Sequence, residues 1–125
     1  MSKSPEVPDP TPFVPLAPAP LHIVLVLNRG ERHGYAIMRD VEDLSDGVIK
    51  MGPGSLYGTI KKLLAGGLIE QSDVRPDPAL DDERRKYYRL TALGRAVCVA
   101  ELDRLAKLVE RTRRAAPTRL IAEPS

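Results

Sequence analysis

Residues 52–67 read GPGSLYGTIKKLLAGG, and this segment constrains the fold more than any other part of the chain. A helical projection at about 100° per residue separates it into two faces. The apolar face, which we expect to lie against a core, is made by Leu56, Ile60, Leu63 and Leu64. The opposite face carries Ser55, Gly58, Lys61 and Lys62. Tyr57 lies on the boundary, and the glycine pair at 66–67 ends the predicted helix.

The same glycine-rich segment could also resemble a catalytic loop. A P-loop needs G-x-x-x-x-G-K-[ST], but neither Gly52 nor Gly54 has a glycine five places later. A nucleophile elbow needs G-x-S-x-G, but Pro53 and Tyr57 occupy the glycine positions around Ser55. The chain offers no set of nucleophile, base and orienting group elsewhere. We therefore expect a protein that is not an enzyme.

Two shorter helices are expected before this segment. Residues 21–30 form an apolar run that a buried strand would also fit, but Pro20 before it and Gly30 at its end favour a helix. In the next segment Ile37, Val41 and Leu44 recur with helical spacing, and charged residues fill the other faces.

Two strand-like runs follow, at residues 68–74 and 84–90, and the prolines between them predict a hairpin with a long tip. Tyr88 and Leu90 fall on the face expected to be buried. The returning run concentrates basic side chains at Arg84, Arg85, Lys86 and Arg89. Three helices and a hairpin in this order are typical of a winged helix-turn-helix, and a basic helix beside a basic wing suits DNA. Two alternatives stay open: a protein–protein interaction module with a solvated basic face, and arginines that protect an exposed strand edge.

Thr91 is the expected N-cap of a long last helix, residues 92–116, which Pro117 stops. Its apolar seam steps by four, three and four residues along Cys98, Leu102, Leu105 and Val109. The helix is too long for this chain to cover, so we expect the seam to pack against a second copy. Cys98 could sense redox state there, although a small buried hydrophobe is the simpler role.

The composition sets limits on the other classes of protein. The chain has 125 residues, one cysteine, two histidines and a formal net charge of +2, so we expect one domain without a disulfide, metal site or cofactor. No apolar run is long enough to cross a membrane, and the N-terminus has no secretory signal, so a cytoplasmic protein is expected. Residues 1–20 are rich in proline and predict an extended, flexible arm.

Four motifs in register resemble the PadR family of bacterial transcriptional regulators. They are the HGY at 33–35, the GSLY at 54–57, the GLI at 67–69 and the RKYYRLTALG that ends at Gly94. The resemblance implies a winged helix-turn-helix domain at 21–91, a dimerisation helix at 92–116, a tail at 117–125, and a dimeric repressor on a pseudo-palindromic operator. The fold that the resemblance implies is mainly α-helical, with a small β-hairpin.

The resemblance also implies roles for individual residues. Ser55 and Tyr57 would touch the DNA backbone, Leu56 would be core, and Lys61 would face the groove. Together with the basic positions above, the predicted DNA-binding residues are Ser55, Tyr57, Gly58, Lys61, Lys62, Arg84, Arg85 and Lys86. Family members commonly release DNA on binding a small aromatic or drug-like effector. The sequence has no tryptophan and one phenylalanine, so it gives little support for an aromatic pocket.

Overall fold

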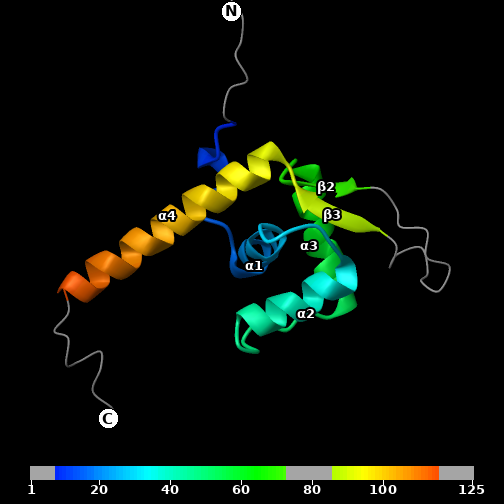
Figure 1. Cartoon of the computed structure of the whole chain (residues 1–125), viewed down its shortest axis with the longest axis horizontal. Helices are drawn as coiled ribbons and strands as arrows, with labels where there is room; N and C mark the ends of the chain where they lie inside the picture. Colours follow the sequence, from blue (N-terminus) through cyan, green and yellow to red (C-terminus); the bar gives the residue numbers. More distant parts are fainter. Residues whose placement is uncertain (1–7, 73–85, 116–125) are drawn as a thin grey trace, which may run out of the picture.

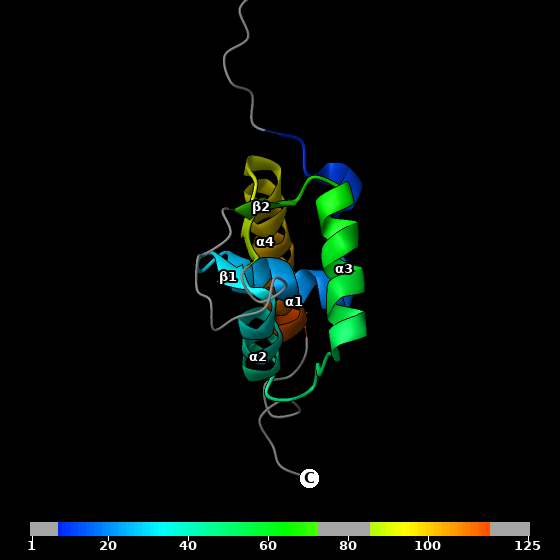
Figure 2. The same cartoon turned by 90° about the vertical axis from the view of Figure 1, so that its right-hand side faces the viewer.

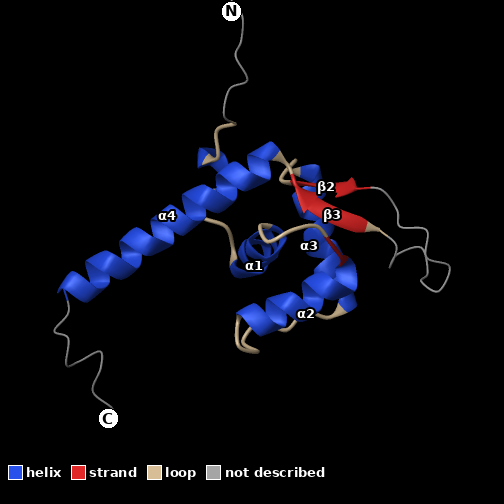
Figure 3. Ribbon diagram, viewed as in Figure 1, coloured by secondary structure: helices blue, strands red, loops and turns tan. Residues whose placement is uncertain are grey.

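The computed structural model describes residues 8–72 and 86–115 (Figure 1). Helices and a small antiparallel sheet follow one another in the order expected of a winged helix-turn-helix domain, and the last helix extends away from it (Figure 3). The elements are η1 (Thr11–Phe13), α1 (Pro18–Leu27), β1 (Arg32–His33), α2 (Gly34–Leu44), α3 (Pro53–Ala65), β2 (Ile69–Ser72), β3 (Tyr87–Leu90) and α4 (Ala92–Ala115).

The run that could have been a strand is helix α1, which begins earlier than expected, at Pro18. Its apolar character on several sides follows from its central position, because α2, α3, α4 and β3 all contact it. Its buried residues are Ile23, Val24, Val26 and Leu27. They form the middle of a single core to which α2, α3, α4, β2 and β3 contribute buried side chains, and Phe13 of η1 packs against it.

The sheet has three strands in the order β1-β3-β2, so the expected hairpin gains a short extra strand. In β1, Arg32 pairs with Tyr88 and His33 pairs with Tyr87. Tyr88 is buried, as the alternation along β3 predicted. β3 is the central strand, but β1 pairs with it only at Tyr87 and Tyr88, so the alternative that Arg89 protects a strand edge stays open, and Arg85 lies outside the described residues.

Local signals at the ends of α3 and α4 act as expected. The amide of Gly67, at φ 79°, donates to the Leu64 carbonyl, and the Leu68 amide donates to the Leu63 carbonyl, which is the hydrogen-bond pattern of a Schellman motif. At the start of α4 the Thr91 hydroxyl oxygen accepts a hydrogen bond from the Gly94 amide at 3.0 Å, which confirms the predicted N-cap.

The beginning of α4 lies directly on Leu68, the residue before β2. A Cβ atom at Gly94 would clash with the carbonyl group of Leu68, so only glycine allows this approach. The Thr91 hydroxyl donates its proton to the carbonyl oxygen of Gly67 at 2.6 Å, and the Thr91 amide donates to the carbonyl oxygen of Leu68 at 3.0 Å. These contacts attach the root of the long helix to the sheet.

Residues 8–17 differ from the expected flexible arm, whereas residues 1–7 lie outside the described part of the chain. Thr11–Phe13 form a short 3-10 helix, and Phe13, Val14 and Leu16 pack against the core. Figure 2 shows this segment beside the C-terminal end of α3. The prolines therefore restrict the backbone without keeping the segment away from the domain.

Only the first part of α4 is covered by the domain. Its buried residues are Gly94, Val97, Cys98 and Glu101, and none from Leu102 to Ala115 is buried. Figure 1 shows the rest of the helix extending past the domain.

Candidate nucleic-acid interface

The outer face of α3 is built as its sequence period predicted. Leu56, Ile60 and Leu63 are buried against the core, as the apolar arc requires. The residues that point outward and are exposed are Ser55, Gly58, Lys61 and Lys62. Figure 2 shows α3 along one side of the domain, with no other described helix or strand lying over it. This face is therefore open to a partner over the whole length of the helix.

The first two turns of α3 carry very little bulk on their exposed side. A Cβ atom added at Gly52, Gly54 or Gly58 would meet no other atom within 4 Å. Internal packing therefore does not require glycine at these positions, although glycine weakens a helix. Gly52 is the N-cap residue and has no side chain with which to cap the first amide groups. These amides and the Ser55 hydroxyl can bind a phosphate that comes close to the backbone.

Tyr57, which was predicted to contact the DNA backbone, is half-buried at the boundary of the outer face. Its ring packs against Gly34, where a Cβ atom would clash with the phenolic oxygen and the ring. The phenolic oxygen is buried. Tyr57 thus connects α3 to the N-terminal end of α2, while part of the side chain stays exposed. The glycine of the HGY motif is explained by this contact, which links two of the motifs.

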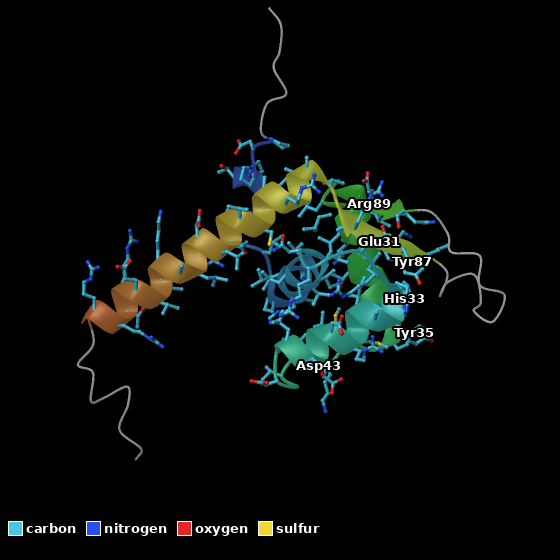
Figure 4. The ribbon with its side chains drawn as sticks, viewed as in Figure 1. Glu31, His33, Tyr35, Asp43, Tyr87 and Arg89 are labelled. Atoms are coloured by element: carbon cyan, nitrogen blue, oxygen red, sulfur yellow. The ribbon has the colours of Figure 1, made fainter. Side chains whose placement is uncertain are left out.

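The N-terminal end of α2 adds polar groups that the sequence reasoning did not include. The Nδ1 atom of His33 accepts a hydrogen bond from the Ala36 amide at 3.2 Å and so caps α2. The His33 ring meets the ring of Tyr87 edge to face, with centroids 5.4 Å apart. Figure 4 shows His33, Tyr35 and Tyr87 near one another at this end of the domain. Tyr35 is exposed. The HGY motif at residues 33–35 was the sequence feature that pointed to this end of α2.

The base of the wing is only partly basic in the described residues. Lys86, which precedes β3, is half-buried, whereas Arg84 and Arg85 lie outside the described part of the chain. Arg89 donates from Nε to Glu70 across the strands at 2.8 Å, and both side chains are about half exposed. This pair leaves little net charge on the exposed face of the sheet at that point.

The seam proposed for α4 begins later than expected. Leu102 and Val109 are 44% and 50% exposed, and Leu105 is partly exposed, so these three remain accessible to a partner. Cys98 is different because it is fully buried in the core of its own chain, and the expectation that it lies on the dimer surface is corrected. Burial raises the pKa of the Cys98 thiol, which keeps it protonated and unreactive. It is the small buried hydrophobe of the simpler alternative.

Two negative findings apply to the described residues. Within residues 8–72 and 86–115, no cluster of three or more His, Cys, Asp or Glu side chains could hold a metal ion. None of the helices in those two ranges is long and apolar enough to cross a membrane.

Residues 23–100 match the family model described as the transcriptional regulator PadR-like family. Among curated proteins, the chain is 32% identical over 88 residues to "Transcriptional regulator Rv3488" from Mycobacterium tuberculosis, covering 70% of this chain and 76% of that protein. It is also 32% identical over 90 residues to an uncharacterised 37.1 kDa protein of transposon TN4556 from Streptomyces fradiae. That match covers 72% of this chain but only 24% of the Streptomyces protein.

Solved structures show the same fold. The complex structure of hsRosR-S4, from H. salinarum, is 27% identical, with a TM-score of 0.63 over 89% of this chain and 86% of the other. A PadR family transcription regulator from Clostridium difficile is 19% identical, with a TM-score of 0.61 over 78% of this chain and 96% of the other. Both structural alignments cover more than three quarters of this chain, and therefore more than a helix-turn-helix unit alone.

Proposed function

Because the chain belongs to the PadR-like family of transcriptional regulators, which bind DNA and are not enzymes, we propose that it is a cytoplasmic, sequence-specific repressor that binds a pseudo-palindromic operator as a homodimer. The observation that carries this proposal is the exposed face of α3. It combines an N-terminus without a side-chain cap, glycines that leave the backbone accessible, and Lys61 and Lys62 further along.

Each part of this face has a counterpart in a DNA groove. The free amides and the Ser55 hydroxyl would bind a backbone phosphate and set the position of the helix. Gly58 would let the helix backbone approach the DNA closely. Lys61 and Lys62 would neutralise phosphates or reach guanine edges. Arg84, Arg85 and Lys86 would add contacts from the wing.

The proposed dimer surface is the exposed apolar seam of α4. Leu102, Leu105 and Val109 border a shallow hollow together with Ala106 and the charged residues Glu110, Arg113 and Arg114. A second copy that covers this seam would present two α3 helices to the same side of a duplex, with half-sites separated by about 34 Å or a multiple of it. Release by a small aromatic or drug-like effector would act by changing how the two α4 helices pack.

A salt titration of DNA binding tests the proposal. The operator is first selected from a random DNA pool, and affinity is then measured by fluorescence anisotropy at several salt concentrations. Each lysine that contacts a phosphate contributes about one unit to the slope of log affinity against log salt. We expect Lys61→Ala to reduce the slope by about one unit, while the control Lys107→Ala, on α4, leaves it unchanged.

The same experiments also test the alternative that the domain binds another protein and not DNA. A selected site with twofold symmetry would support the homodimer. If the full-length protein selects no sequence and binds no duplex even at low salt, the DNA-binding proposal is wrong, and the basic face of α3 is solvated surface.

A further inference from the structure

The segment of residues 10–16, which we call the N-terminal bracket, touches both the recognition helix α3 and the long helix α4. At one end of the contact, an edge carbon of the Phe13 ring lies 3.5 Å from the position of a Cβ atom at Gly66, at the C-terminal end of α3. Val14 and Leu16 pack against the hydrophobic core. The bracket also contacts α4 directly through η1.

The second attachment is a buried ionised side chain on α4. Glu101 is completely buried. Its Oε2 accepts a hydrogen bond from the Leu16 amide at 2.7 Å, and its Oε1 accepts one from Nε of Arg104, also at 2.7 Å. A buried carboxylate is destabilising unless such partners satisfy it. An apolar residue would fill this position on α4 as well, so the carboxylate is explained by the bracket that it holds.

The bracket joins two elements that are not extensively packed together. Between α3 and α4 the structure has little direct contact, and α1 lies between them. The direction of α3 relative to α4 is therefore set by the segments that contact both helices. The N-terminal bracket is one of these segments, because it contacts the C-terminal end of α3 through Phe13 and the middle of α4 through Leu16.

We propose that the N-terminal bracket fixes the position of the recognition helix relative to the dimerisation helix, with Phe13, Leu16 and Glu101 as its positioning residues. In the dimer that we propose above, on which this inference rests for its effect on DNA, the angle between α3 and α4 determines the separation of the two recognition helices. The bracket would thus determine which half-site spacing the protein accepts.

The first test measures the position of α3 without DNA. Spin labels are attached at Lys62→Cys on α3 and Lys107→Cys on α4 in a Cys98→Ala background, and labelled protein is diluted with unlabelled protein so that only distances within one chain are measured. We expect a narrow distance distribution in the parent protein. Loss of the bracket should shift or broaden this distribution.

Two substitutions loosen the bracket in different ways. Phe13→Ala removes the contact with Gly66. Glu101→Gln keeps the shape of the side chain but leaves one oxygen acceptor for two donors. The controls are Val48→Ala, an apolar truncation at an exposed position, and Asp103→Asn, the same change of charge at an exposed carboxylate of α4. Phe13→Ala keeps the test valid if Glu101→Gln does not fold.

The second test uses palindromic operators whose half-sites are moved one base pair closer or further apart. One base pair moves a half-site by about 3.4 Å and turns it by about 35°. For Phe13→Ala and Glu101→Gln, we expect the preference for the best spacing over its neighbours to fall by about threefold or more, because less deformation of the DNA is needed. Binding to a single half-site should not change, whereas a merely less stable protein would lose affinity for all sites alike.

The two tests separate the inference from the proposed function. Distance distributions that match the parent in both variants would overturn the inference, whether or not the protein binds DNA. Changed distributions in a protein that binds no duplex would support the bracket and refute the DNA-binding proposal. Changed distributions with an unchanged spacing preference would overturn the role of the bracket in spacing.

Discussion

Gly58→Ala should affect folding and DNA binding in opposite directions. Gly58 lies in the middle of α3, it is exposed, and an added Cβ atom meets nothing within 4 Å. The substitution therefore adds a methyl group without an internal clash. Alanine favours a helix interior over glycine by about 1 kcal/mol, mainly because glycine loses more backbone entropy on folding. The free energy of unfolding should rise by about that amount.

The same methyl group would stand between the helix and a DNA groove. If the backbone at Gly58 approaches the DNA closely, the methyl group holds α3 away and lengthens the contacts on either side of it. A good base contact contributes about 1–3 kcal/mol, so we expect an affinity loss of about tenfold, or about 1.4 kcal/mol. Both subunits of a dimer carry the change, so this value is a lower estimate.

Urea unfolding measures the first effect, and anisotropy with the selected operator at fixed salt measures the second. Asp103→Ala is a matched control, because it also replaces a residue of lower helix propensity at an exposed helical position, but on α4 and outside the stripe of Leu102, Leu105 and Val109. It should leave affinity unchanged. A more stable Gly58→Ala protein with unchanged affinity would refute close approach at this glycine, and a less stable protein would refute the packing argument.

Three further outcomes are expected. Gly34→Ala should lower the free energy of unfolding by about 2 kcal/mol because the methyl group meets the Tyr57 ring, and Tyr57→Leu in the same chain should recover part of the loss in urea unfolding. Burial raises the pKa of Glu101, but the hydrogen bonds from Arg104 and the Leu16 amide outweigh it, and the pKa lies below its usual 4.5. The stabilisation that ionised Glu101 provides should therefore be present above pH 4.5 and be lost as pH falls through the lower pKa of the folded state. The free energies of unfolding of wild type and Glu101→Gln should therefore converge in acid. A difference that stays constant with pH would contradict this. Leu105→Glu should give a folded monomer in light scattering with affinity for a palindromic operator reduced by about 100-fold or more, whereas a dimer would show that the seam is not the interface.

The parts of the fold that sequence predicted are those fixed by local chemistry. The two faces of α3 follow from the helical period alone, since Leu56 and Ile60 are one turn apart on the inner side. The C-terminal end of α3 follows from the bond of the Gly67 amide to Leu64, and the start of α4 from the bond of the Gly94 amide to Thr91. None of these features depends on distant parts of the chain.

The features that sequence did not predict depend on contacts between distant residues. Strand β1 has two residues, too few for any period, and it exists because Tyr87 and Tyr88 lie next to it. The prolines before α1 predict an extended backbone, but nothing local shows that Phe13 meets the end of α3.

The sequence did not predict how deeply two candidate site residues are buried. Tyr57 lies on the boundary of the helical projection, and the space that admits its ring is created by Gly34 on another helix. Cys98 fits the spacing of the seam, but it also belongs to a stripe of the same helix that faces its own domain: Gly94, Val97, Cys98 and Glu101. Two stripes overlap at Cys98, and the sequence does not indicate which of them buries it.

The attachment of α4 at Thr91 and Gly94 makes this helix a lever arm. Its uncovered part, residues 102–115, spans about 21 Å, so a rotation of about 9° would move the far end by roughly 3 Å. That displacement is close to the rise of one base pair, about 3.4 Å. In the proposed dimer on DNA, a change at Gly94 no larger than one methyl group would thus alter the length of the DNA site, although Gly94 lies far from the tip of the helix.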